Sequence, residues 1–257
     1  MMPADPKFPM PVKQFLDNAE TFLQRSDIVL SRSRTWWSWL IRLITGGTFS
    51  HCAIVFLLPQ AENQMNNTFL LESVSQGVGI SNLLTYVEGK STRSQIAIKR
   101  LEHVWADVAF QKQVGGIMLD RINAGYDFNR AVHIGLSVVF GARLGWLKLW
   151  GASHDSMQKA VQHNNRIRRK WIPPQFICGG FIQYGFLQAQ LRRGGEPGDV
   201  IFRNDVSLGD YDELLAITPE DIATTPKLTW QYVIRNGWVH RVETYEEAKR
   251  VMSSAPL

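Results

Sequence analysis

The chain has 257 residues, of which 45% are hydrophobic and 20% are charged, and its formal net charge is +5. These values are typical of a globular protein with a sizeable core, and we expect one domain carrying an insertion. They argue against a disordered chain. No nucleic-acid-binding motif is present, so no nucleic-acid partner is expected. A mildly basic surface would suit an anionic lipid or an anionic cell-wall polymer.

The chain has only two cysteines, Cys52 and Cys178, which is too few for a disulfide framework, although one bridge between them could form. The N-terminal segment contains acids and lacks an apolar core, so it does not resemble a secretory signal. No apolar run reaches the roughly 18–20 residues that a membrane span needs. We therefore expect a soluble cytoplasmic protein, with signal-independent export as an open alternative.

The sequence predicts short helices and strands that alternate in the first half of the chain. Residues 1–12 hold several prolines and are expected to form a tail. Expected next, in chain order, are a helix at 12–23, a strand at 27–32, a helix at 35–44, strands at 50–58 and 65–74, a short helix at 81–87 and a strand at 94–101. The two central strands flank a polar turn at 59–64 and predict a hairpin.

The second half predicts a helix at 105–124, a helical insertion at about 129–172, and a buried helix at 176–191. A one-turn helix opened by Pro219 and a last strand at 237–245 follow. Mixed helices and adjacent antiparallel strands indicate an α+β fold. We expect a tail and short helix at 1–22, a catalytic domain at 23–235, and a C-terminal extension at 236–257.

Cys178 is the strongest candidate for a reactive group. It follows Pro173 and Pro174 and begins the helix at 176–191, and a helix N-terminus stabilises a thiolate. Gly179 and Gly180 remove side-chain bulk beside the sulfur. The backbone N–H groups of Cys178 and Gly179 could then form an oxyanion hole. The alternative is a buried, inert cysteine.

His51 and Glu72 are the candidate partners of this thiol. His51 heads an apolar strand, and strand alternation puts Cys52 on the opposite face, in the core. Glu72 is an acid within the apolar strand FLLESV, where an unpaired carboxylate is costly. A hairpin loop at 59–64 would place His51 directly opposite Glu72, so that the acid could orient the base. A structural histidine and a surface glutamate are the alternatives.

Six segments carry a resemblance to a known family. They are DIVLSRS, FSHCAIVF, FLLESV, GYDF, FICGGFIQYGF and ITPEDI, spread in this order over roughly residues 26–225. The chain resembles the circularly permuted papain-like hydrolases of the NlpC-related YiiX/YebB type. The resemblance implies Cys178 as nucleophile, His51 as base and Glu72 as the third polar residue. It also implies a small antiparallel sheet packed against helices, including the helix that Cys178 heads, and neither a metal nor an organic cofactor.

A tryptophan-rich helix bears on the substrate. Trp36, Trp37 and Trp39 lie in the apolar segment TWWSWLIRLI, which would either pack in the core or contact substrate or a membrane surface. Three hypotheses follow. The first is a thiol amidase or peptidase acting on peptides or cell-wall peptides. The second is a thiol lipid-ester hydrolase or acyltransferase at a membrane. The third is a non-catalytic binding module. The first is favoured, since amide chemistry dominates the wider NlpC-type group.

Overall fold

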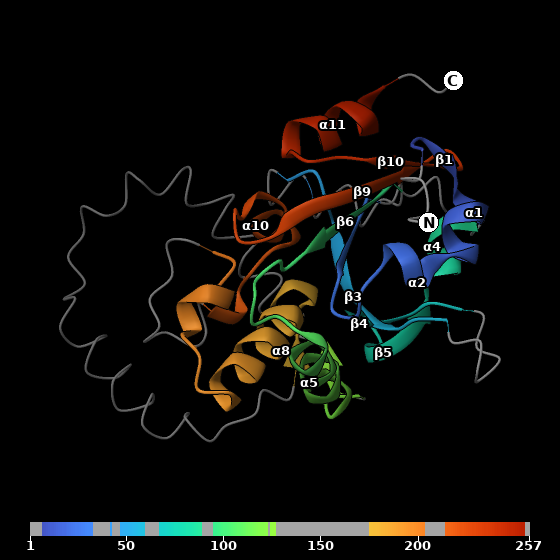
Figure 1. The fold of residues 1–257 in the computed structure, drawn as a ribbon. Helices are drawn as coiled ribbons and strands as arrows, with labels where there is room; N and C mark the ends of the chain where they lie inside the picture. The colour runs from blue at the N-terminus through green and yellow to red at the C-terminus, as the bar shows by residue number, and fades with distance from the viewer. Residues whose placement is uncertain are drawn as a thin grey trace, which may run out of the picture.

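The computed structural model describes residues 7–32, 42, 47–59, 67–88, 95–122, 124–126, 175–203 and 214–254 (Figure 1). The statements below concern these residues. The predicted helix at 35–44 lies outside them apart from Arg42, and so do Trp36, Trp37, Trp39 and the predicted insertion at 129–172.

An antiparallel sheet forms the centre of the described part of the chain, in the order β1-β10-β9-β6-β2-β3-β4-β5. Its strands are β1 Met10–Pro11, β2 Ile28–Arg32, β3 His51–Leu57, β4 Phe69–Val74, β5 Gly77–Asn82, β6 Gln95–Arg100, β9 Thr229–Arg235 and β10 Trp238–Arg241. A separate parallel pair joins β7 Gly125–Tyr126 to β8 Gln175–Phe176. This sheet of eight strands is larger than the small one that was expected, because both ends of the chain contribute strands to it.

The helices lie on both faces of the sheet (Figure 1). They are α1 Val12–Asp17, α2 Ala19–Phe22, α4 Leu83–Glu88, α5 Val108–Leu119, α8 Cys178–Arg192, α10 Pro219–Thr224 and α11 Tyr245–Ser253, with a 3₁₀ helix, η3, at Pro197–Val200. Mixed helices and antiparallel strands confirm the predicted α+β class.

Buried apolar side chains form two clusters, one on each face of the sheet, as strand alternation requires. Alternate residues of β3 illustrate the division: Ala53 and Val55 pack with α1, α2 and α4, whereas Cys52 and Ile54 pack with α5 and α8. α8 is buried along most of its length and lies beside α5 (Figure 1). The helix that begins at Cys178 therefore packs against the His51 strand through the cluster that contains Cys52 and Ile54.

Most strand predictions hold, with differences at turns and ends. The strands predicted at 27–32, 50–58 and 94–101 are β2, β3 and β6. The helix predicted at 12–23 is broken at Asn18. Strands β1, β5, β7, β8 and β9 and helix α11 were not predicted. β1 lies within the expected tail, and β8 includes Phe176, where a helix was expected to begin. No helix within the described ranges is both long enough and apolar enough to cross a membrane.

The predicted register of the central hairpin is wrong by two residues. Glu72 lies opposite Ala53 rather than His51, and the observed register shifts once, between Val55 and Leu57, where the β3–β4 pairing is irregular. A shift of two residues preserves the face on which each side chain lies, whereas a shift of one would reverse it. His51 and Glu72 therefore still occupy the same face, as diagonal neighbours.

Candidate active site

Cys178 is the first residue of α8, as predicted. Ile177 precedes it in an extended conformation, with φ −83° and ψ 160°, and its side chain does not cap the helix. The first N–H groups of a helix have no partner within the helix, and its N-terminus carries a partial positive charge. A sulfur at this position is therefore next to N–H groups that have no partner within the helix, and in a field that favours the thiolate.

His51 and Glu72 are in direct contact. The His51 Nε2 atom lies 2.7 Å from the Glu72 Oε2 atom, and the two side chains are 21% and 9% exposed. Cys178 is close enough to His51 to raise the pKa of the imidazole. The three predicted site residues are thus brought together in the order thiol, imidazole, carboxylate.

The charges of these three groups support one another. Burial by itself would lower the pKa of His51, but hydrogen bonds and the negative charges of Cys178 and Glu72 outweigh burial and raise it to about 10. Burial raises the pKa of Glu72, yet its contacts with His51 leave the net pKa below the ordinary value. A protonated imidazole between two anions is the state that these interactions favour.

Cys52 is part of the site, which strand alternation alone did not indicate. It is fully buried, as predicted, but its thiol hydrogen-bonds to Cys178, and this contact is the largest cause that holds the pKa of Cys178 well below its ordinary value. His51 adds to that lowering, against the effect of burial. Burial and the contact with Cys178 raise the pKa of Cys52, so it stays a protonated donor.

Tyr86, on α4, is a further member that sequence reasoning missed. Its hydroxyl donates to the same Glu72 oxygen that contacts His51. Its ring is stacked against the His51 ring, with centroids 6.3 Å apart and planes 10° apart. No sequence signal marks Tyr86, because α4 follows the unpredicted strand β5 and reaches Glu72 only through the β4–β5 pairing.

The two glycines after Cys178 are required by packing. A Cβ atom at Gly179 would lie 2.1 Å from the carbonyl oxygen of Ile217, and one at Gly180 would lie 2.1 Å from that of Leu215. The sequence interpretation attributed these glycines to substrate access. Their close contact with residues 215–218 gives a direct structural reason for them, and the backbone N–H groups of Cys178 and Gly179 remain the candidate oxyanion donors.

The segment that begins at Leu215 also contacts the approach to the His51 strand. Glu220, in α10, accepts a hydrogen bond from the backbone N–H of Thr48 at 2.6 Å. The hydroxyl of Tyr245 donates to the other oxygen of Glu220 and lies 3.0 Å from the Thr48 hydroxyl. The residues around α10 therefore contact both the start of the Cys178 helix and the loop that leads into β3.

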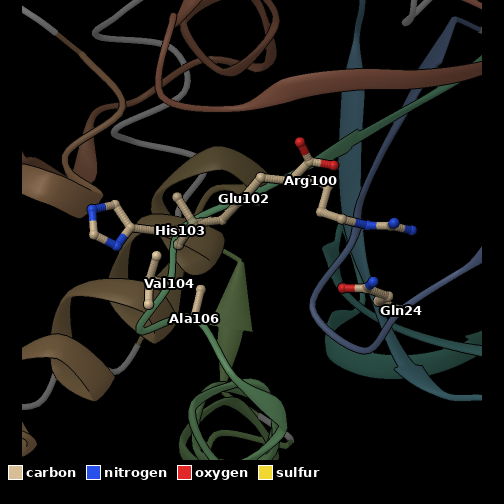
Figure 2. Close-up of a pocket in the computed structure, with 7 residues that line it drawn as sticks. Gln24, Arg100, Glu102, His103, Val104 and Ala106 are labelled. Carbon is tan, nitrogen blue, oxygen red and sulfur yellow. The ribbon is translucent and has the colours of Figure 1, made fainter.

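A hollow at the C-terminal end of β6 lies at the opposite end of the strands from His51, since Lys99 pairs with Ile28 and His51 pairs with Ser31. Its lining residues include Gln24, Arg100, Glu102, His103, Val104 and Ala106 (Figure 2). Among the described residues, no three His, Cys, Asp or Glu side chains form a group that could hold a metal ion.

Comparisons with known proteins give likenesses among solved structures, where five chains match this one. No protein-family model and no curated protein matches the chain. Among solved structures, the chain is similar to the metalloprotein YiiX from Escherichia coli O157:H7, with a TM-score of 0.46 and 16% sequence identity over 81% of this chain and 96% of that protein. At this level of similarity, the function must be argued from the residues of the chain itself.

Proposed function

We propose that the chain is a cysteine hydrolase on a permuted papain-like fold that cleaves an amide bond in a peptide or cell-wall peptide. The observation that supports this most directly is the continuous contact from Cys178 through His51 to Glu72, with the nucleophile at a helix N-terminus. Nucleophile, base and orienting acid within hydrogen-bonding reach are the general signature of covalent acyl transfer.

The proposed reaction has two halves, acylation and deacylation of Cys178, and each catalytic residue acts in both of them. The Cys178 thiolate attacks the substrate carbonyl carbon, and the N–H groups of Cys178 and Gly179 bind the oxyanion. His51, protonated and held by Glu72, gives its proton to the leaving amine, which leaves a thioester on Cys178. Water, deprotonated by His51, then attacks the thioester, and the acid product departs as the thiolate re-forms.

A lipid ester is the second candidate substrate. The same three residues would open an ester, and the specific observation in its favour is the cluster Trp36, Trp37 and Trp39 beside Arg34 and Arg42 in the sequence. Tryptophan and arginine are favoured at membrane interfaces. This candidate requires affinity for lipid surfaces, which an enzyme that acts on soluble peptides does not need.

A labelling experiment tests the nucleophile before the substrate is known. Cys178 is alkylated with iodoacetamide across a range of pH, and the modified peptide is quantified by mass spectrometry. Rapid labelling well below the ordinary thiol pKa of about 8.5, slowed in His51→Ala, is the expected result. A slow thiol that is indifferent to His51 would contradict the proposal and leave the binding module as the better description.

Substrate class is decided next, with Cys178→Ala as the inactive control. Peptides, cell-wall peptides and phospholipid vesicles are offered separately, and amide or ester cleavage is measured. Cleavage of amides without binding to vesicles supports the amidase. Vesicle binding with acyl release supports the lipid candidate instead.

A further inference from the structure

The site contains a second thiol for which the proposed reaction has no covalent role. Cys52 adjoins His51 in β3 and faces α8, and both residues contact Cys178. The two cysteines are the only ones in the chain, and both are free thiols. The fold thus places the other cysteine of the chain beside the proposed nucleophile, in the same cluster of buried side chains between β3 and α8.

We propose that Cys178 is a site of oxidation by hydroperoxides and that Cys52 resolves the oxidised sulfur as a reversible Cys52–Cys178 disulfide, which switches the enzyme off. This inference rests on the proposed function, since it takes the Cys178 thiolate as the reactive group. It adds a regulatory chemistry to the same site and a specific role for Cys52.

Exposure and charge set the order of the two steps. Cys178 is 7% exposed and Cys52 is fully buried, so a small oxidant reaches Cys178 first. Thiolates react with peroxides and thiols hardly do. Cys178 is the sulfur held as a thiolate, while Cys52 keeps its proton. The peroxidatic sulfur is therefore Cys178 and the resolving sulfur is Cys52.

The chemistry balances with a hydroperoxide as the only added reactant. The Cys178 thiolate bonds to one peroxide oxygen, the O–O bond breaks, and the leaving hydroxide takes a proton from His51 to give water. Cys52 then loses its proton to His51 and attacks the sulfenic sulfur. The S–O bond breaks, and the departing hydroxide is protonated to a second water. Two thiols lose two electrons, and the peroxide is reduced.

The elements that carry the two cysteines, α8 and β3, pack against each other in one cluster of buried side chains. A disulfide requires the two sulfurs to approach to about 2.05 Å. Cys178 is the first residue of its helix, where the backbone is held by fewer hydrogen bonds than in the interior. Once the disulfide forms, neither the thiolate nor its hydrogen bond with His51 survives, so the proposed hydrolase is inactive until a reductant restores it.

The test treats the whole chain with hydrogen peroxide and measures intact mass and titratable thiols. The expected result is a mass lower by two hydrogen atoms, loss of both thiols, a cross-linked peptide containing Cys52 and Cys178, and full recovery with dithiothreitol. Cys52→Ser should instead be oxidised at Cys178 to sulfinic and sulfonic acids, which dithiothreitol does not reduce. Cys52→Ala should give the same products more slowly, because it also loses the contact that lowers the pKa of Cys178. Peptide mapping of the wild-type chain gives the answer even if both variants fold poorly.

The outcomes separate this inference from the proposed function. Iodoacetamide labelling of Cys178 is measured in parallel on untreated protein. If Cys178 labels rapidly at low pH, but peroxide adds oxygen to Cys178 while Cys52 keeps its thiol, the disulfide inference is overturned and the nucleophile stands. If Cys178 neither labels nor oxidises, the proposed function and this inference both fall.

Discussion

The Nε2 atom of His51 lies 2.7 Å from the Oε2 atom of Glu72, although Ala53 is the residue paired with Glu72 across the strands. The two side chains meet diagonally on one face of the sheet. Diagonal neighbours in an antiparallel pair are within reach of long side chains. The contact therefore depends on a glutamate, whose side chain is one methylene longer than that of an aspartate.

The length and charge of the Glu72 side chain predict the outcome of replacing it. Glu72→Gln keeps the shape and removes the charge that stabilises the His51 cation, so kcat should fall by about 100-fold or more. Glu72→Asp should also lose activity because its carboxylate is too short for the diagonal contact. Steady-state kinetics check both, with the exposed Glu243→Gln as the control. Unchanged kcat in Glu72→Gln would show that Glu72 does not act through His51.

The pH dependence follows from the raised pKa of His51. The folded protein keeps the His51 proton until about pH 10, whereas an unfolded histidine loses it near 6.5. The resulting stabilisation is complete below about pH 6.5 and is lost as the pH rises through 10. The lowered pKa of Cys178 acts in the opposite direction, and its contribution is lost as the pH falls through the folded value.

Activity should therefore remain high through the neutral range and fall above about pH 10, where His51 can no longer protonate the leaving group. Alkylation of Cys178 should not fall there, because the thiolate persists. A pH–rate profile set beside a labelling profile measures both. An activity that rises with a midpoint near the ordinary thiol pKa would contradict the ion pair.

Tyr86→Phe should reduce the activity without abolishing it. A hydrogen bond to a charged group contributes about 1.5–3 kcal/mol, and its loss frees Glu72 to shift relative to His51. We expect kcat to fall by about tenfold, KM to stay unchanged, and the alkaline limit of the pH profile to move. Tyr232→Phe is the matched control, since Tyr232 packs against Phe8 and Phe15. Equal effects of the two variants would indicate that Tyr86 has only a packing role.

Gly179→Ala should destabilise the fold and abolish activity. Its new Cβ atom would lie 2.1 Å from the Ile217 carbonyl oxygen, and backbone at that distance must move, at a cost of about 1–3 kcal/mol or more. Gly116→Ala, in α5, is the matched helical control because its Cβ atom meets nothing within 4 Å. Thermal denaturation should show a lower Tm for Gly179→Ala and an equal or higher one for Gly116→Ala. Two equally stable variants would refute the packing argument.

Local sequence patterns predicted the parts of the site that depend on short-range physics. Strand alternation put Cys52 on the face opposite His51. The start of α8 at Cys178 and the strand at His51 follow from prolines, glycines and apolar periodicity, which act within a few residues. The position of Glu72 within an apolar strand was enough to predict it as a site residue, because a buried carboxylate needs a partner.

The tertiary structure decided what depends on pairing between distant segments. The register of Ala53 against Glu72 depends on an irregularity in the β3–β4 pairing and on a longer connection between the strands, which no local pattern specifies. The stacking of Tyr86 on His51, the contact of Cys52 with Cys178, and the carbonyl of Ile217 against Gly179 all join residues far apart in the chain. Such contacts follow from how helices dock on a sheet, where many residues fix each position together, and a sequence read one segment at a time does not contain that information.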